Sequence, residues 1–492
     1  MFLPKNEKVL ALALNAWRSG AQLRANRHRY KQYTYGKQWN DPVKDDNGNI
    51  ITEGEYALRC GKKPMTNNLI RQLVKCVVGR FRSNIDQTPI PDKATQLFYE
   101  QNNLNELDSR MLEEFLISGC AIQRITPKQA ANQVPRVDNI NPAKFFVNNF
   151  SDPRGWDIEM VGVLHDMSIA ELIMRFANGD RQRAKALRQL YSSDSIDVDG
   201  SFFKPPHGRC RVIEVWTLEC EEVLLCHDRL KGEAFMIAVD DSRQIEHENR
   251  VRQQEGLEPI TSQWKINTHW HCQYLAPDGT ILHSSKSHNT HPFVIKFYPL
   301  IDGEVHSFVE DVIDQQRYIN RLIVMIDHIM STSAKGALLF PANQRHESMT
   351  WEQIASQWAK SDSVIPYNPS AGNPGPQQIA ANNTNIGAFE LLSLEMKLFD
   401  EVSGVGNALL GKNTAPSTGS ALYESQIKNA VIALADIFET FNHFRSTRDK
   451  LIHNSYFIIH NLLVSALMFI LTFCQNFNTQ LPQSVTPPCS KR

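Results

Sequence analysis

The chain has 492 residues, more than a single hydrophobic core usually organises, so we expect at least two domains or lobes. Hydrophobic residues make up 42% and charged residues 21%, as in an ordinary globular protein. The 52 Lys and Arg residues nearly balance the 53 Asp and Glu residues, which argues against a protein that grips nucleic acid through a dominant basic field.

The nine cysteines stand at irregular spacings without a C-x-x-C pair. This pattern disfavours both metal knuckles and a disulfide scaffold, and it fits a reducing cytoplasm. The first fourteen residues mix charges with a short apolar stretch, unlike a secretory signal, so we interpret them as the start of an amphipathic helix.

The N-terminal third is predicted to be mostly helical. Apolar residues recur at helical spacing in three segments, which cover residues 6–31, 69–82 and 93–119. Thr66 or Asn67 is the expected N-cap of the second segment.

The middle third is predicted to be an α+β lobe, which makes the fold class α+β and mostly helical. Alternating or β-branched stretches predict strands within 121–163 and over 212–218, 264–274 and 292–298. Asp278-Gly279 is a strong hairpin signal. Helices are expected over 167–191, capped by Ser168, and over 240–255, where the high charge indicates a solvated helix.

Residues 311–420 form the most informative segment. A helix is predicted over 311–334, a second over 386–403, and a small, polar, Gly-rich loop follows over 404–420. Between the helices we expect a strand at 337–340, a helix at 350–360 with Trp351, Ile354 and Trp358 inward, a strand at 363–367 and a loop at 368–385. At roughly fifty residues this module is too small for a core of its own.

The Gly-rich loop contains a match to the phosphate-binding pattern G-x-x-x-x-G-K at Gly406–Lys412. Asn413 stands where that motif needs a hydroxyl for Mg²⁺, and Thr414 comes one position too late. The pattern also follows a helix instead of a buried strand. We interpret the segment as a mobile loop whose Lys412 can approach a phosphate backbone.

Histidines suggest a possible metal site in the middle third. His269 and His271 alternate on one strand face, with Cys272 on the other, and His283, His288 and His291 follow. Surface or half-buried strand histidines are the default interpretation, because no second ligand cluster stands at a recognisable spacing. We therefore predict no metal ligand and no cofactor.

The first helical segment carries a basic run, which consists of Arg18, Arg24, Arg27, Arg29 and Lys31. The run fits either a solvated helix face or a surface that contacts DNA or a neighbouring subunit. Hydrolase, metalloprotease, EF-hand and dinucleotide-binding motifs are absent from the sequence, so we predict that the chain is not an enzyme.

The order of segments between about residues 10 and 450 resembles the portal proteins of tailed bacteriophages, especially the podovirus-type branch of these head-tail connectors. The strings that carry the resemblance are Tyr33–Trp39, Pro64–Val74 with Val78-Gly79 after it, Leu116–Gly119, Asp314–Asn320 and Thr418–Ala421.

The resemblance implies a ring-forming protein with wing, stem and clip. By position, the parts are a wing over 1–308, stem helix 1 over 309–334, a clip over 335–385, stem helix 2 over 386–403, a tunnel loop over 404–420, a long wing helix over 421–454 and an atypical apolar C-terminus over 455–492 in which the family's crown is missing.

The resemblance also implies the functional residues. The DNA-facing tunnel-loop residues are Gly404, Gly406, Asn407, Lys412, Asn413, Thr414, Ser417, Thr418 and Ser420. The stem residues are Asp314, Gln315, Arg317, Asn320 and Arg321. The clip residues expected to dock terminase or an adaptor are Arg345, His346, Glu347 and Glu352.

The implied assembly is a homo-oligomeric ring, usually of about twelve subunits, at one capsid vertex. The expected partners are double-stranded DNA in the channel during packaging and ejection, the terminase large subunit, the major capsid or scaffold protein, and head-completion or tail adaptor proteins. We expect the ring in the virion, and in the host cytoplasm during assembly.

The C-terminus departs from the family. The run Tyr456–Cys474 is almost entirely apolar, and Asp and Glu are absent after residue 455. A truncation or a frame change near residue 455 is one interpretation, and a bilayer-spanning segment is another. The alternatives to a portal are therefore a membrane-anchored phage assembly scaffold and a P-loop packaging NTPase.

Overall fold

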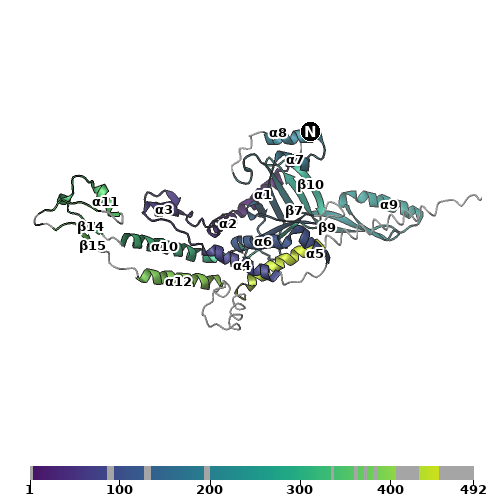
Figure 1. Cartoon of the computed structure of the whole chain (residues 1–492). Coiled ribbons are helices and arrows are strands. Elements are labelled where there is room, and N and C mark those ends of the chain that lie inside the picture. Colours follow the sequence, from purple (N-terminus) through teal and green to yellow (C-terminus); the bar gives the residue numbers. More distant parts are fainter. Residues whose placement is uncertain are drawn as a thin grey trace, which may run out of the picture.

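The computed structural model describes residues 4–85, 93–126, 135–192, 200–333, 337–359, 364–370, 372, 374–379, 386–405 and 432–453. The molecule is elongated, and a body of mixed helices and sheets lies at its centre (Figure 1). A helix pair with a small module projects from one side of this body and a β-ribbon from the other. This mixture of helix and strand confirms the predicted α+β class.

The predicted first helix is interrupted. Helix α1 spans Glu7–Ser19 and α2 spans Ala21–Thr34, with Gly20 between them. The interruption lets α1 lie on the central sheet, where Trp17 packs among Phe146 and Phe202, while α2 packs against α6. A single helix over 6–31 was therefore a wrong prediction, because two different surfaces bury the two halves.

Three helices build the core beneath α2. They are α4 (Leu69–Ile85), α5 (Lys93–Asn102) and α6 (Leu104–Ser118). Helix α4 confirms the predicted segment 69–82, whereas the predicted segment 93–119 is divided at Asn103, whose φ is +50°. The cap of α4 is Asn68 instead of Thr66 or Asn67, since its side chain accepts a hydrogen bond from the Arg71 amide at 3.0 Å. Helix α6 is central, with Leu112, Phe115 and Leu116 almost fully buried.

The largest sheet has six antiparallel strands in the order β10-β9-β7-β6-β5, with β8 also paired to β7. Their bounds are Phe145–Val147 (β5), Met160–Met167 (β6), Cys210–Asp228 (β7), Glu233–Ala238 (β8), Thr261–Leu275 (β9) and Ile281–His288 (β10). The predicted strands and the hairpin at Asp278-Gly279 are confirmed, and the turn glycine has φ +84°.

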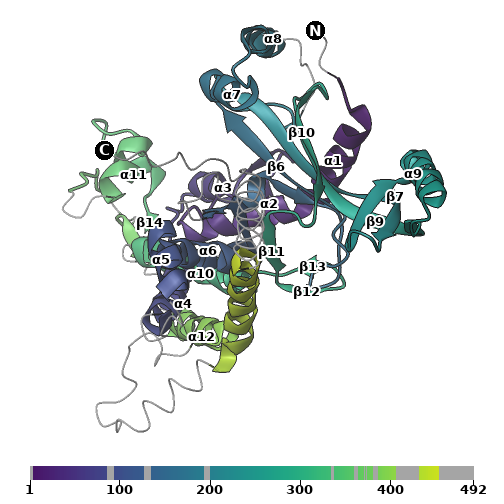
Figure 2. The same cartoon turned by 90° about the vertical axis from the view of Figure 1, so that its right-hand side faces the viewer.

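Strand β7 is much longer than the predicted 212–218, and β9 is slightly longer than the predicted 264–274. They pair from Ile213 opposite Leu275 to His227 opposite Thr261, so they extend beyond the sheet as a ribbon. The solvated helix predicted near its end is α9 (Ser242–Glu255), and Arg252 fixes it to Asp228 at 2.7 Å. Figure 2 shows α9 lying against this ribbon, away from the other helices.

A second sheet joins the helical core to the large sheet. It has the order β11-β3-β4, with bounds Cys120–Thr126 (β3), Arg136–Asn139 (β4) and Phe293–Phe297 (β11). Two small hairpins are β1–β2 (Pro42–Lys44, Ile50–Thr52) and β12–β13 (Pro299–Ile301, Glu304–Val305). The remaining body helices are α3 (Glu53–Arg59), α7 (Ile169–Phe176) and α8 (Arg181–Ser192), and Ser168 caps α7 as predicted.

The projecting part begins with the short turn η3 (Glu310–Val312) and helix α10 (Ile313–Ser333), and it returns through α12 (Ile386–Ser403). These helices agree with the two predicted ones. At their far end lie β14 (Ala337–Leu339), α11 (Trp351–Ala359) and β15 (Gln377–Ile379).

Three predictions about this terminal module were wrong. A strand was expected at 363–367, and in its described part, 364–367, the only pairing is a single bridge between Tyr367 and Arg345. Pro366 within it has no amide hydrogen to donate. The strand that pairs with β14 is β15, in a region predicted as loop. Within α11, Ile354 is buried and Trp358 half-buried, but Trp351 is 47% exposed.

Candidate functional site on the projecting helices

Helices α10 and α12 lie side by side along the projection (Figure 1). The base of α10 is rooted in the body, because Val309, Val312 and Ile313 just before and at its start are almost fully buried in the main core. From that base the pair leads outward to the terminal module. The projection is thus a continuous helical structure and is firmly attached at one end.

Two of the predicted stem residues hold the projection to α3. Arg317 Nη2 lies 2.8 Å from Glu53 Oε2, and Arg321 Nε lies 2.5 Å from Glu53 Oε1. Burial alone would lower the pKa of Arg317, but the hydrogen bond and charge of Glu53 outweigh it and raise that pKa. Both guanidinium groups are therefore paired within the subunit.

A buried amide pair continues this attachment. Asn320, only 2% exposed, donates to Gln38 Oε1 at 2.6 Å and accepts from the Asn67 amide at 3.1 Å. Gln316, one turn earlier, accepts from the Leu69 amide at 2.8 Å and donates to the Asn67 carbonyl at 2.7 Å. Gln316 was not among the predicted stem residues, although its i, i+4 spacing to Asn320 could have identified it.

The other two predicted stem residues behave differently. Asp314 is exposed, whereas Gln315 is partly buried and its Oε1 has no hydrogen-bond partner. Next to them, burial and the neighbouring charge of Glu310 raise the pKa of Asp311. Of the predicted stem residues, Arg317, Asn320 and Arg321 therefore attach to the body, whereas Asp314 faces away from it.

Gly404 begins the predicted tunnel loop directly after α12. Its φ of +65° is a conformation that favours glycine, and its amide donates to the Glu401 carbonyl at 3.2 Å, so it ends the helix. Residues 406–420 of the loop lie outside the described residues, and these include the Gly406–Lys412 pattern. These predicted residues are Gly406, Asn407, Lys412, Asn413, Thr414, Ser417, Thr418 and Ser420.

The predicted clip residues lie in and beside the turn that precedes α11. Arg345 donates to the Met349 carbonyl at 2.6 Å, and the His346 ring pairs through Nδ1 with Ser348 Oγ at 2.6 Å. Glu347 and Glu352 are exposed. The structure thus brings Arg345 and His346 together in a bonded turn, while both carboxylates point into solvent.

The projecting helices expose apolar side chains. On α12 most of the described side chains are exposed or half-exposed, and Leu394 is 51% accessible. The large apolar residues exposed on the two helices are Tyr318, Met325, Met330, Phe389, Leu394, Met396 and Val402. An apolar surface of this kind marks a site of association with another molecule.

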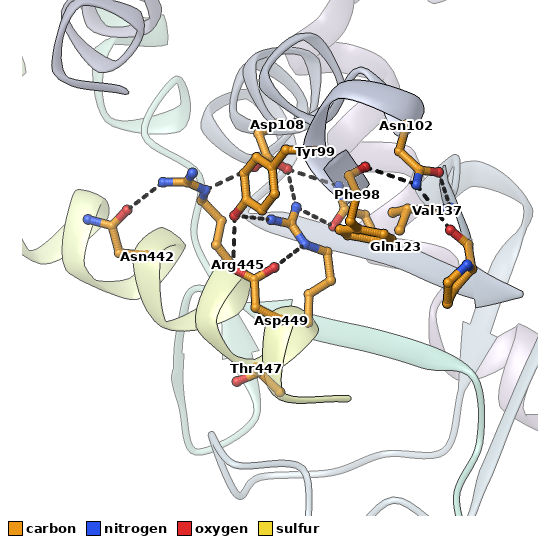
Figure 3. A network of polar contacts seen from close by, with 12 residues as sticks. Phe98, Tyr99, Asn102, Asp108, Gln123, Val137, Asn442, Arg445, Thr447 and Asp449 are labelled. Atoms are coloured by element: carbon orange, nitrogen blue, oxygen red, sulfur yellow. Dashed lines mark hydrogen bonds and ion pairs between the residues drawn. The ribbon is translucent and has the colours of Figure 1, made fainter. Parts of the chain in front are cut away.

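The helical stretch 432–453 returns the chain to the body and is held there by a buried ionic network (Figure 3). Asp108 of α6 binds Arg448 through Oδ1 and Arg445 through Oδ2, the latter at 2.9 Å. Asp108 and Arg448 are fully buried. Burial would lower the pKa of Arg448, and the charge of Asp108 raises it instead.

The basic run of the first two helices is mostly used inside the subunit. Arg27 pairs with Glu114 at 2.5 Å, Arg29 pairs with Asp41 at 2.8 Å, and Arg24 stacks on the Trp17 ring at 3.5 Å. Burial lowers the pKa of Arg24 to about 10. The solvated-face interpretation is wrong for these three residues, while Arg18 and Lys31 are exposed.

The histidines of β9 and β10 differ in exposure, since His269 and His271 are buried, His283 is exposed and His288 is half-buried. His269 and His271 are each 4% exposed, because the β7–β9 ribbon and neighbouring side chains cover them. Burial also lowers the pKa of His291 to about 4. The default prediction of surface or half-buried histidines was therefore wrong for His269 and His271.

Among the residues that the structure describes, no helix combines the length and the apolar character that crossing a bilayer requires. The apolar run Tyr456–Cys474 lies outside the described residues.

Comparison with known protein families places the chain among the structural proteins of the phage virion. It belongs to the family of phage P22-like portal proteins, whose model matches residues 13–447. This match confirms the resemblance to podovirus-type portals. No curated protein sequence matches the chain.

Proposed function

We propose that this chain is one subunit of a portal ring at a capsid vertex, through which double-stranded DNA is packaged and later ejected. In this proposal the body (1–308) is the wing, 309–334 and 386–403 are the stem helices, and 335–385 is the clip. Residues 404–420 form the tunnel loop, 421–454 the long wing helix, and 455–492 an atypical apolar C-terminus. The family match and the projecting helix pair support this assignment.

The observation that carries the proposal is the apolar surface of α10 and α12. A helix as rich in leucine as α12 normally buries an apolar stripe, yet Phe389 and Leu394 are about half exposed in the single subunit. Neighbouring copies of the same helices, repeated around a closed ring, would cover this surface. A ring of about twelve subunits is the expected assembly.

The charge distribution suits conduction of DNA better than tight binding. The net charge is −1, and the stem cations Arg317 and Arg321 are already paired with Glu53. DNA affinity depends on free cations that displace counterions from phosphates. A stem with paired arginines would let DNA pass, and the tunnel-loop residues, with Lys412 among them, would supply the contacts.

The terminal module is the proposed docking site for other phage proteins. Glu347 and Glu352 are exposed beside the bonded turn of Arg345 and His346, so a partner with a basic surface fits them. The proposed partners are the terminase large subunit during packaging and an adaptor or tail protein afterwards. The major capsid or scaffold protein would contact the wing.

This assignment makes the chain a structural protein that acts without a cofactor and does not catalyse hydrolysis. The ring would assemble in the host cytoplasm and remain in the virion. Shortening the tunnel loop should leave ring assembly intact but reduce the amount of DNA retained in filled heads. Normal DNA retention by such a variant would argue against the role of the loop.

Leu394→Glu tests the proposal. A charge in the apolar surface of the stem should prevent ring closure, while far-ultraviolet circular dichroism should show an unchanged fold. Leu230→Glu is the matched control, because Leu230 is equally exposed at 51% but lies in the turn between β7 and β8. Native mass spectrometry should find rings for the control and monomers for Leu394→Glu. Intact rings for both variants would contradict the proposed stem packing.

A further inference from the structure

Four polar side chains meet on one face of the β7–β9 ribbon near the large sheet. Glu219 and Glu221 come from β7, and His269 and His271 come from β9. Glu219 is directly opposite His269 in the strand register, and side chains two residues apart share a face of a strand. The ribbon therefore gathers two carboxylates and two imidazoles at one place.

The imidazole of His269 has no hydrogen-bond partner. Its side chain is only 5% exposed, and neither Nδ1 nor Nε2 forms a hydrogen bond. Nε2 lies 3.9 Å from Glu219 Oε2 and 3.7 Å from Glu221 Oε1, too far for hydrogen bonds to either oxygen. A buried polar ring without a partner is costly, so the space between these three atoms needs an explanation.

The separations suit a metal ion. The ligand atoms of Glu219, Glu221 and His269 all lie within 4.8 Å of one another. Imidazole nitrogens and carboxylate oxygens bind Zn²⁺ at about 2.1 Å, which places two ligands of a tetrahedral ion about 3.4 Å apart. Movement of a few tenths of an ångström in the side chains would bring the two distances measured from Nε2 to that value.

His271 orients one of the carboxylates. Its Nδ1 lies 2.6 Å from Glu219 Oε1, and its Nε2 lies 2.7 Å from Ser284 Oγ of β10. Both ring nitrogens are thus occupied, and Glu219 is held with Oε2 directed at His269. Hydrogen bonds of this kind to a ligating carboxylate fix its position and strengthen metal binding.

We propose that Glu219, Glu221 and His269 bind a divalent transition-metal ion, with Zn²⁺ as the best fit and water in the remaining position. One nitrogen and two oxygen donors suit Zn²⁺ better than Ca²⁺ or Mg²⁺, which favour all-oxygen sites. The ion would bridge β7 to β9 at the base of the ribbon that carries α9. It would thereby stiffen this ribbon independently of any role in a ring.

The test uses the full-length protein, treated with a chelator, dialysed and titrated with Zn²⁺ by calorimetry. Co²⁺ serves as a second probe, because its visible absorption reports a nitrogen and oxygen site of low coordination number. Cys220 is exposed on the opposite face of β7, so all variants are made in a Cys220→Ser background to remove the thiol next to the proposed site.

In that background the protein should bind one equivalent of Zn²⁺, and His269→Gln should weaken binding at least tenfold. His306→Gln is the matched control and should bind normally. His306 also lies near two glutamates, Glu304 at 3.3 Å and Glu310 at 3.6 Å, but it meets them through different nitrogens.

Glu221→Gln provides a second variant in case His269→Gln does not fold, because the Glu221 side chain is 49% exposed and the fold should tolerate its replacement. It too should weaken binding at least tenfold. Absence of Zn²⁺ uptake by the unsubstituted site, or equal binding by the substituted ones, would overturn the proposal. In that case His269 would be a buried imidazole without a ligand.

Discussion

Arg448→Met tests whether the helical stretch 432–453 is held to the body by the ionic network of Figure 3. Methionine keeps much of the length of the side chain and its apolar stem but removes the guanidinium. That group donates to Asp108, to Gln123 Oε1 at 3.3 Å, to the Tyr99 hydroxyl at 3.0 Å and to Asp449 at 2.9 Å.

The expected cost follows from what remains at Asp108. Removing one member of a buried ion pair costs about 3–5 kcal/mol, because the other charge is left without compensation. Asp108 keeps Arg445 at 2.9 Å and Gln123 at 3.2 Å, so the lower limit of this range applies. We expect the variant to lose about 3 kcal/mol, which corresponds to about a 100-fold change in the local opening equilibrium.

Hydrogen–deuterium exchange measured by mass spectrometry checks this expectation. Amides in 432–453 should exchange about 100-fold faster in Arg448→Met, while amides in the large sheet should keep their rates. Arg445→Met is the control, and since Arg445 is 20% exposed we expect only about a fivefold effect. Unchanged exchange in Arg448→Met would show that apolar packing alone holds the helix, and would refute the reasoning.

Three further predictions concern the body. Glu53→Gln removes the anion that pairs with Arg317 and should lower the local stability by about 2 kcal/mol, which faster amide exchange in α3 would report. Unchanged exchange rates would mean that the ion pair adds no stability. Burial alone would raise the pKa of Glu214, but hydrogen bonding by His165 and the charge of Arg124 hold it at about 2, against 4.5 ordinarily. The ionised Glu214 should therefore add about 3 kcal/mol to the free energy of unfolding above pH 4.5, and this contribution should disappear as the pH falls towards 2. The unfolding free energies of wild type and Glu214→Gln, measured by urea titration, should converge in acid. A difference that stays constant with pH would contradict this. Gly162→Ala would place a Cβ 2.2 Å from Phe146 Cζ and should lower the free energy of unfolding by about 3 kcal/mol in thermal melts. Gly79→Ala is the control, because its Cβ would meet no atom within 4 Å. Equal melting temperatures for the two variants would contradict this close packing.

Local patterns were sufficient to predict the helices that define the projection. The predicted bounds of α12, Ile386–Ser403, are those of the structure, because its apolar side chains recur at helical spacing and a Gly at position 404 ends it. Ser168 likewise capped α7 as expected. Caps and periodicity act within a few residues, so the sequence reveals them directly.

Features that depend on distant partners were missed. The strand β15 reads Gln-Gln-Ile, which is a weak strand signal, and it forms because β14 lies opposite it. Glu53 meets Arg317 from 264 positions away, and Glu219 meets His269 only through the register of the β7–β9 ribbon. Spacing along the chain contains no information about such contacts, so the attachment of the projecting helices and the candidate metal site became visible only in the structure.

Electron microscopy of the purified full-length protein in negative stain tests the central claim most directly. End-on views, classified by symmetry, should show closed rings of about twelve subunits around a central channel, with the projecting helices and terminal modules forming a narrower end in side views. A folded protein that remains monomeric at high concentration, by microscopy and by native mass spectrometry, would contradict the portal-ring account.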